Sequence, residues 1–472
     1  MAVRDYTARR PTVKRLYSVS LDKPSLGSNS SYAAIKLLIA RAWMTSDLLG
    51  SVFFIVFVAL TLRLAVVVLL YHQQLSPGRD YFHFGWEIGR VARSIASGYG
   101  FGSPLFAETG PTAMVTPLYT FLLALVFKLF GVYTAQSAMA ILSLNSLFSA
   151  LTCLPIFFIA RQTFGSAVAV RAAWVWAFFP YAIDFAAARV WGDCLNALLL
   201  SIIFLIALSL QQTNSIAGWL LFGLLSGLAA LNCPTIISTL PFLAALACYR
   251  LKRSGKKYTL SMSIAAIAMV VMVSPWLVRN QLIYKQFIPF RDNFWLEMYI
   301  GNTGDTSDIV PDWTHPATSK EEMEKFRQMG ELAYMSEKRR QTIDFIATHP
   351  LTFLWLSVRR MVYIWTGFWS FSAGYLGLEP FAIPNMIFCS MLTAVMMKGL
   401  WSAWRKNREV AMNYAVVLIS YPMIYYITHP TMDYRHPIDP LIIVLAMYAV
   451  RMVKDGVRQE IVVFDPGLDV ST

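Results

Sequence analysis

The nine residues YRLKRSGKK at 249–257 decide how this chain is arranged, because they place five basic side chains between two apolar runs. In membrane proteins such clusters mark the loops that stay in the cytoplasm. The whole composition agrees with a membrane setting: 57% of the residues are hydrophobic and 14% are charged, with a mean hydropathy of +0.52. A soluble domain is about one quarter charged. The sequence therefore predicts an all-α polytopic membrane protein.

Twelve apolar runs could serve as membrane spans, which need roughly 20 residues each. They lie near 49–71, 115–133, 137–160, 167–186, 194–211, 216–231, 235–249, 258–278, 351–369, 382–402, 410–428 and 437–452. If the N-terminus is cytoplasmic, an even number of spans must precede 249–257, and 115–133 then lies along the surface. The same parity makes 351–369, with Arg359 and Arg360 at its centre, interfacial or re-entrant. We expect about ten spans with both termini in the cytoplasm; eleven or twelve stay open if either segment crosses.

This count divides the chain into five regions. A basic cytoplasmic tail, with eight Lys or Arg, comes first, and a second cytoplasmic tail comes last. Loops longer than about 12–15 residues are usually functional or disordered. The aromatic content of the long outside loop favours a packed, functional segment over a disordered one. The regions are the tail 1–48, a transmembrane module 49–278 with a first outside loop at 72–136 holding two juxtamembrane helices, the long extracytoplasmic loop and interfacial segment 279–381, the C-terminal helices 382–452, and the tail 453–472.

The stretch RDYFHFGWEIGRVARSIASGYGFGSP at 79–104 carries the first candidate acid, Glu87. A carboxylate at the edge of a membrane is costly and usually functional. Asp80, two turns earlier, is a second acid in the same stretch. An amphipathic interfacial helix with merely solvated charges is the alternative interpretation. Its apolar side is expected to hold Phe84, Val91 and Ile95, and its polar side Arg90 and Arg93.

Asp193, in RVWGDCLNALLL at 189–200, begins a predicted span on the same side of the membrane. An aspartate there suits helix capping as well as catalysis, and Arg189 is placed to pair with Asp184. Several cations are also predicted outside. Arg and Lys at an interface commonly snorkel, whereas a cluster facing one cavity would bind a phosphate. The candidates for such a cluster are Arg279, Lys285, Arg359, Arg360 and Arg435.

Other chemistries find little support in the sequence. The six histidines show no metal-ligand spacing, and GYGFG at 98–102 does not match a nucleotide-binding glycine loop. The five cysteines sit in or beside apolar runs and are interpreted as small core residues. We assign the net charge of +13 to orientation signals and anionic membrane lipid, and not to nucleic acid.

Five pieces of sequence, in this order, resemble landmarks of one family of membrane enzymes. They are FGWEIGRVARSIASGYGFGSP at 84–104, GPTAMVTPLYTFLLALVFKLFG at 110–131, GLLSGLAALNCPT at 223–235, SPWLVRNQLIYKQFIPF at 274–290 and DYRHPIDPLIIVLA at 433–446. Together they resemble the GT-C membrane glycosyltransferases, in particular the protein-mannosyltransferase-like and aminoarabinose-transferase-like branch that uses polyprenyl-phosphate sugars. The resemblance runs over nearly the whole chain.

The resemblance implies a GT-C-like fold in which Glu87 is the catalytic acid of the first loop and Asp193 the second acidic position. It implies transfer of a hexosyl or pentosyl group from a polyprenyl-phosphate donor to a hydroxyl of a glycan, lipid or protein. The reaction would occur on the outer face of a membrane, most simply the bacterial plasma membrane, as part of cell-envelope chemistry. Trp86 stands where many relatives carry another acid, which argues against a paired or metal-binding role for Glu87. The sequence leaves the need for a divalent metal open.

A secondary transporter of a small solute or lipid-linked sugar is the alternative function. Such a protein should show an internal repeat and interrupted spans near the midplane. The sequence shows no convincing repeat, and its polar residues concentrate in the outside loops. A non-catalytic partner of a flippase is a third class, which would tolerate the loss of Glu87.

Overall fold

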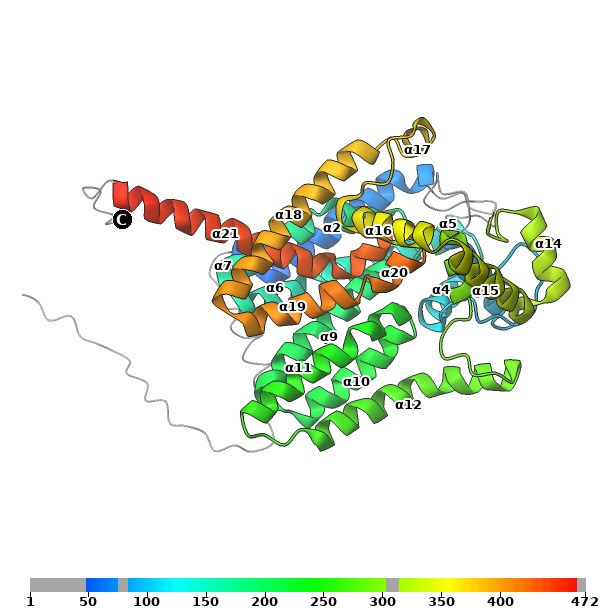
Figure 1. Ribbon diagram of the computed structural model, residues 1–472, viewed down its shortest axis with the longest axis horizontal. Coiled ribbons are helices and arrows are strands. Elements are labelled where there is room, and N and C mark those ends of the chain that lie inside the picture. The colour runs from blue at the N-terminus through cyan, green and yellow to red at the C-terminus, as the bar shows by residue number, and fades with distance from the viewer. Residues whose placement is uncertain (1–47, 75–83, 303–313, 465–472) are drawn as a thin grey trace, which may run out of the picture.

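The computed structural model describes residues 48–74, 84–302 and 314–464. Nearly all of the tail 1–48, Asp80 and the last residues of the tail 453–472 therefore lie outside the described residues. Within these ranges the regular secondary structure is helical, apart from one isolated β-bridge between Gly102 and Pro111. Turns and loops connect the helices. The helices run side by side along the long axis of the molecule, and the C-terminal α21 extends beyond the others at one end (Figure 1).

Among the described residues, eight helical segments are long and apolar enough to cross a membrane. They are α2 (Val52–Gln74), α5 with α6 (Ala135–Leu151, Cys153–Phe164), α9 (Asp193–Thr213), η3 with α11 (Pro234–Ser238, Leu240–Arg253), α12 (Thr259–Tyr284), α18 (Ala382–Lys406), α19 with α20 (Arg408–Ser420, Met423–Ile427), and η5 with α21 (Met432–Ile438, Asp439–Phe464). The pair α7 (Ser166–Ala177) and α8 (Pro180–Ala187), bent by 44°, is a ninth candidate. Helix α10 (Ile216–Ala230) is apolar but has only 15 residues. The expected ten spans require both the bent pair and α10 to cross, so that number stays a prediction.

A buried arginine explains how the bent pair is tolerated among apolar helices. Backbone groups freed by a helix break must find partners inside a membrane protein. Arg63 of α2 is fully buried and donates to the carbonyl oxygens of Trp176 (3.1 Å) and Ala177 (3.0 Å), where α7 ends. Its Nε also donates to the hydroxyl of Ser149 on α5 (2.8 Å). The break is thus held by helices on two sides.

Small residues allow other helices to approach closely. A Cβ atom on Gly223 of α10 would lie 2.1 Å from the carbonyl oxygen of Ala265 on α12. Close backbone contact through glycine is a common way of joining helices in a membrane, where apolar burial gives little drive for association. This contact fixes α10 along α12, a helix of 26 residues and about 39 Å.

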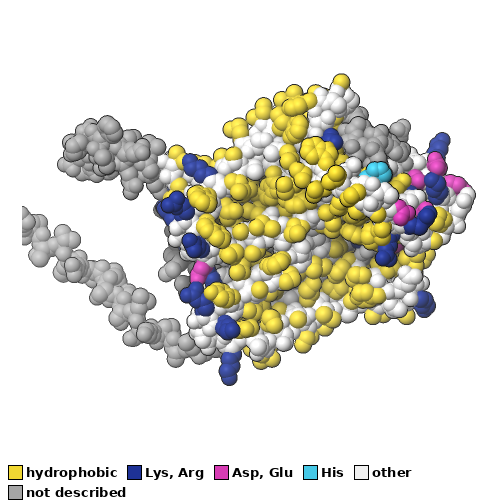
Figure 2. All heavy atoms as spheres, in the orientation of Figure 1, with side chains coloured by type: hydrophobic (Ala, Val, Ile, Leu, Met, Phe, Trp, Pro, Cys, Tyr) yellow, Lys and Arg dark blue, Asp and Glu magenta, His cyan; other side chains and the backbone are white. Residues whose placement is uncertain are grey.

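Three basic stretches meet at one end of the bundle, which we call the basic end (residues 249–257, 404–410 and 451–452). Arg250 and Arg253 pair with Glu409 at 2.9 and 3.0 Å, and Lys406 contacts the sulfur of Met452 at 3.0 Å. Figure 2 shows Lys and Arg side chains gathered at this end and a broad hydrophobic surface between it and the charges of the other end. These contacts bring the three stretches together at one end.

The opposite end, called the site end, carries the shorter helices (Figure 1). They are α3 (Trp86–Ala96), α4 (Pro117–Phe130), α13 (Phe294–Gly301), α14 (Lys320–Met329) and α15 (Glu331–Thr348), with α16 (Pro350–Thr366) and α17 (Ala373–Leu378) following. Both helices expected in the first outside loop, α3 and α4, are present. Helices α4 and α16, with 14 and 17 residues, are shorter than the helices that qualify as spans.

One expectation for α3 is wrong. Phe84 and Val91 are buried, as predicted, but Arg90 is buried as well, with 1% of its surface exposed. Its guanidinium lies over the ring of Phe106 at 3.9 Å. The glycine-rich segment after α3 folds back over the helix and covers the side that the sequence assigned to solvent.

Candidate functional site

Glu87 lies in the first turn of α3, which begins with two residues in left-handed conformation. Gly85 has φ of 88° and Trp86 has φ of 47°. A Cβ atom on Gly85 would lie 2.7 Å from the carbonyl oxygen of Val190, so glycine is required both for the backbone angle and for the close approach. Because Val190 lies three residues before Asp193, this contact places Glu87 beside the entry to α9. The structure therefore brings the elements of both predicted acids together.

His315, from the segment before α14, is the direct partner of Glu87. Its Nε2 lies 3.2 Å from Glu87 Oε1, and its ring stacks on Trp86 with centroids 5.3 Å apart. The backbone N–H of Ala317 donates to His315 Nδ1 at 3.0 Å. Because Nδ1 is the acceptor in that bond, the proton on Nε2 faces the Glu87 carboxylate.

The environment of Glu87 favours its ionised form. Its side chain is only 12% exposed, and burial by itself would raise its pKa. The hydrogen bond from His315, with the more distant charge of Arg291, outweighs burial and leaves the pKa of Glu87 below its ordinary value. Near neutral pH the carboxylate is therefore ionised, which is the state in which a general base must start.

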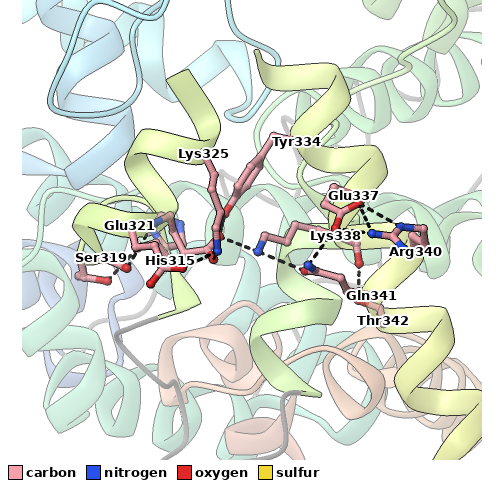
Figure 3. Close-up of polar contacts among 12 residues, drawn as sticks. His315, Ser319, Glu321, Lys325, Tyr334, Glu337, Lys338, Arg340, Gln341 and Thr342 are labelled. Carbon is pink, nitrogen blue, oxygen red and sulfur yellow. Dashed lines mark hydrogen bonds and ion pairs between the residues drawn. The ribbon is translucent and has the colours of Figure 1, made fainter. Parts of the chain in front are cut away.

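A buried ion pair between α14 and α15 supports the segment that carries His315 (Figure 3). Lys338 on α15, with 1% of its side chain exposed, lies 2.6 Å from Glu322 on α14. The hydroxyl of Tyr334 donates to the same carboxylate at 2.6 Å. Lys338 also lies over the ring of Tyr299 on α13, 3.9 Å from its centroid. These contacts hold α13, α14 and α15 together next to the segment that carries His315.

A carboxyl pair joins α15 to the loop between α3 and α4. Glu331 accepts hydrogen bonds from the hydroxyl of Thr112 and the backbone N–H of Ala113, both at 2.6 Å. Neither carboxyl oxygen of Asp292 accepts from a donor among the described residues. Burial, followed by the neighbouring charge of Glu331, raises the pKa of Asp292 well above its ordinary value. Burial and the charge of Glu331 thus favour the protonated form of Asp292.

The entry to α9 holds a second group of charges. Arg189 lies 3.5 Å from Asp184, as the sequence predicted, and 3.6 Å from Asp433 of η5. Asp193 is buried close to both Arg189 and Asp433. The amide of Asn232 donates to the carbonyl oxygen immediately before Asp193 at 3.3 Å and so fixes the turn.

A chain of polar contacts links α13 to the same η5 segment. Arg291 Nη2 lies 3.7 Å from Glu297 Oε1, and Glu297 Oε2 lies 3.1 Å from His429 Nδ1. His429 Nε2 in turn lies 3.1 Å from the hydroxyl of Tyr434, the neighbour of Asp433. Sequence reasoning missed His315, Glu297 and His429, because each has a partner far away along the chain.

Two of the five predicted phosphate-binding cations each donate to two or more backbone carbonyls. Arg279 donates from Nη1 to the carbonyl of Thr112 at 2.8 Å and from Nη2 to that of Phe101 at 2.9 Å. Arg360 is buried and donates to carbonyl oxygens at the end of α13 and in α20: Gly301, Tyr426 and Ile427. Each of these arginines joins two segments of the site end.

The other three cations differ in setting. Arg359 is half-buried on α16, with its guanidinium 4.1 Å above the ring centre of Trp369. Arg435 is buried and binds Asp439 through Nε at 3.0 Å, while its Nη2 has no hydrogen-bond partner among the described residues. Lys285 is exposed at the end of α12. The structure thus gathers Arg359, Arg360 and Arg435 around α16 and keeps Arg279 and Lys285 at the end of α12.

Comparisons with known proteins agree with this architecture. Residues 114–278 match the family model for dolichyl-phosphate-mannose-protein mannosyltransferase. The apo form of the Archaeoglobus fulgidus oligosaccharyltransferase superposes with a TM-score of 0.55 at 15% identity, covering 88% of this chain and 52% of that one. The archaeal oligosaccharyltransferase AglB from Archaeoglobus fulgidus, in complex with an inhibitory peptide and a dolichol-phosphate, superposes with a TM-score of 0.53 at 15% identity, covering 89% of this chain and 52% of that one. The chain has the GT-C fold.

The GT-C fold confirms the architecture expected from sequence, although the chain spans only about half the length of the oligosaccharyltransferases that it matches. ArnT from Cupriavidus metallidurans bound to undecaprenyl phosphate superposes less well, with a TM-score of 0.48, 17% identity and coverage of 85% and 60%, and no conclusion rests on it. No curated protein matches the sequence. The matched family segment contains Asp193 and ends with most of α12, whereas Glu87 precedes it.

Across 48–74, 84–302 and 314–464, no group of three or more His, Cys, Asp or Glu side chains converges as metal ligands do. The roles predicted for Glu87, Asp193 and the five cations stay predictions.

Proposed function

We propose that this protein is a membrane glycosyltransferase that moves a sugar from a polyprenyl-phosphate donor to a hydroxyl acceptor, with Glu87 as general base. The carrying observation is the contact between Glu87 and His315, which holds a buried, ionised carboxylate at one end of a GT-C fold. The dolichol-phosphate and peptide in the AglB structure support a lipid-phosphate donor here. Glycan, lipid and protein acceptors remain equally open.

The reaction follows from the chemistry of the groups. The acceptor oxygen attacks the anomeric carbon while its proton passes to Glu87, and the bond from that carbon to the phosphate oxygen breaks with the electron pair leaving on the phosphate. Because His315 holds Oε1, the second carboxylate oxygen of Glu87 serves the acceptor. Asp193, with Arg189 beside it, orients the acceptor or the sugar from the α9 side.

Fixed cations stabilise the departing lipid phosphate. Arg435 is best suited to this role, because its Nη2 donor has no hydrogen-bond partner among the described residues. Its Nη1 donates to the carbonyl oxygen of Ile364 on α16, the helix that also carries Arg359. Lys285 supplies a further exposed cation. We assign Arg279 and Arg360 first to the backbone carbonyls they hold, so that their loss should lower stability before it affects the donor.

The site end faces away from the cytoplasm in this proposal, and both termini lie inside. The support is the positive-inside rule together with the gathering of residues 249–257 and 404–410 at the basic end. Donor sugars carried on membrane lipids would then meet Glu87 at the outer surface.

The test is transfer by purified protein supplied with candidate polyprenyl-phosphate sugars. Glu87→Gln keeps the size of the side chain and removes the basic oxygen, so the rate should fall by about 10²–10⁴. Glu324→Gln is the matched control, because Glu324 is an exposed acid on α14 at the same end. A Glu87→Gln protein that keeps more than about one third of the wild-type rate at saturating donor would refute the base role. Movement of a sugar lipid across vesicles without any transfer product would favour a transporter instead.

A further inference from the structure

A pocket of about 280 Å³ lies at the basic end, far from Glu87. Three helix ends and the middle of a fourth helix surround it: the last turn of α6, the last turn of α18, the first turn of α19 and the middle of α21. Its walls include Phe164, Lys406, Asn407, Tyr448 and Arg451. The rings of Phe164 and Tyr448 stack with centroids 4.0 Å apart and form one wall.

Two cations define the chemistry of this pocket. Lys406 Nζ lies 3.0 Å from the sulfur of Met452, the neighbour of Arg451, so the two basic side chains border the same space. Arg451 Nη1 donates to the carbonyl oxygen of Phe164 at 3.1 Å, which orients its guanidinium at the pocket wall. An ammonium group beside a planar guanidinium is a pair that suits phosphate oxygens.

The neighbouring acid does not oppose this charge. Glu409, in the first turn of α19, is taken up by Arg250 and Arg253 at 2.9 and 3.0 Å. The same turn also presents the N-terminus of a 13-residue helix, α19, where Asn407 accepts from the backbone N–H of Val410 at 3.2 Å. Backbone N–H groups at a helix start add to the attraction for an anion.

We propose that this pocket binds the phosphate of an anionic phospholipid headgroup. The basic end forms one boundary of the hydrophobic surface in Figure 2, so the pocket lies at the depth of lipid headgroups. Basic pockets between membrane helices on this side are a recurrent means of holding phosphorylated headgroups. A soluble phosphate compound has the same anionic chemistry and is the competing source of the ligand.

The experiment measures lipid binding by the full-length protein, purified in a neutral detergent, using native mass spectrometry and thermal unfolding. Phosphatidylglycerol should be retained and should raise the melting temperature, whereas phosphatidylcholine should do neither. Lys406→Ala should weaken phosphatidylglycerol binding about tenfold or more, as expected for one lost contact to a charged group. Lys252→Ala, which removes an exposed lysine of the basic end outside the pocket, should leave binding unchanged.

Three results would overturn the proposal. Equal retention of phosphatidylcholine would exclude headgroup charge as the cause, and an equal loss in Lys252→Ala would reduce the effect to general attraction. Inorganic phosphate that stabilises the protein at millimolar concentration, with no effect of phosphatidylglycerol, would replace the lipid by a soluble ligand. Arg451→Lys keeps the charge and serves as a second variant if Lys406→Ala fails to fold. Because binding is read directly, failure here leaves the proposed transferase activity untouched.

Discussion

Replacing His315 by alanine removes the only side chain that donates a hydrogen bond to Glu87 among the described residues. The carboxylate would stay buried, and burial disfavours its charge. The pKa of Glu87 should therefore rise when the His315 donor is lost. The base would then be protonated over a wider range of acidic and neutral pH, and transfer would fail there.

The size of the effect follows from the strength of the lost bond. A hydrogen bond to a charged group contributes about 1.5–3 kcal/mol, which corresponds to about a 10- to 150-fold change in the protonation equilibrium. On the acidic limb of the pH–rate profile, the rate of His315→Ala should fall below the wild-type rate by about this factor. At alkaline pH, where Glu87 is ionised in both proteins, the two rates should converge.

The assay is the rate of sugar transfer at saturating donor across pH, with His315→Gln as the matched control. Glutamine offers an amide N–H in place of imidazole Nε2–H but cannot reproduce the stacking on Trp86, so it should restore most of the acidic limb. Superimposed profiles for His315→Ala and wild type would refute the role of His315. A loss of rate that is equal at every pH would show that His315 only supports the fold.

Three further predictions concern the packing around the site, the ionisation of Asp292 and the membrane topology. Gly85→Ala should destabilise the protein more than Gly98→Ala in thermal unfolding. Both glycines have positive φ, which costs an L residue roughly 1–2 kcal/mol, but of the two only Gly85 would place a Cβ against a carbonyl oxygen, at 2.7 Å. Equal losses of stability would contradict the close packing at Gly85. Asp292, whose pKa is raised in the folded protein, contributes stability at low pH that is lost as the pH rises through its folded value. The melting temperature of Asp292→Asn should therefore gain on that of wild type as the pH increases, and a constant difference would exclude a raised pKa of Asp292. Cysteines introduced at Ser254 and Glu324, both exposed, should react with an impermeant reagent from opposite sides of the membrane in a background without the native cysteines; reaction from one side would refute the predicted topology.

The positions of the apolar helices could be predicted from the sequence. Lipid replaces water around each span, so every backbone group must bond within its own helix and the apolar run must match the bilayer thickness. That requirement acts on consecutive residues and is visible in one dimension. Within 115–133 and 351–369 the structure has helices of 14 and 17 residues, α4 and α16, which are shorter than the helices that qualify as spans.

Only part of the candidate site could be predicted from the sequence. Glu87 stood out because a carboxylate at the edge of a membrane is costly and usually functional. His315 gave no such signal, since an isolated histidine before a proline has many ordinary uses. The same holds for Arg90, whose helical position faces solvent until the following loop folds back over it.

The sequence by itself determined the membrane class, the helical runs and the acids at their ends, because hydropathy and helix periodicity depend on near neighbours. The tertiary structure alone decided which of these residues meet: Glu87 with His315, Arg360 with the carbonyls of α20, and Lys406 with the pocket at α21. Such contacts form only when loops close between residues far apart along the chain, and the partners are chosen by packing in three dimensions. A single sequence carries no local pattern from which that choice can be read.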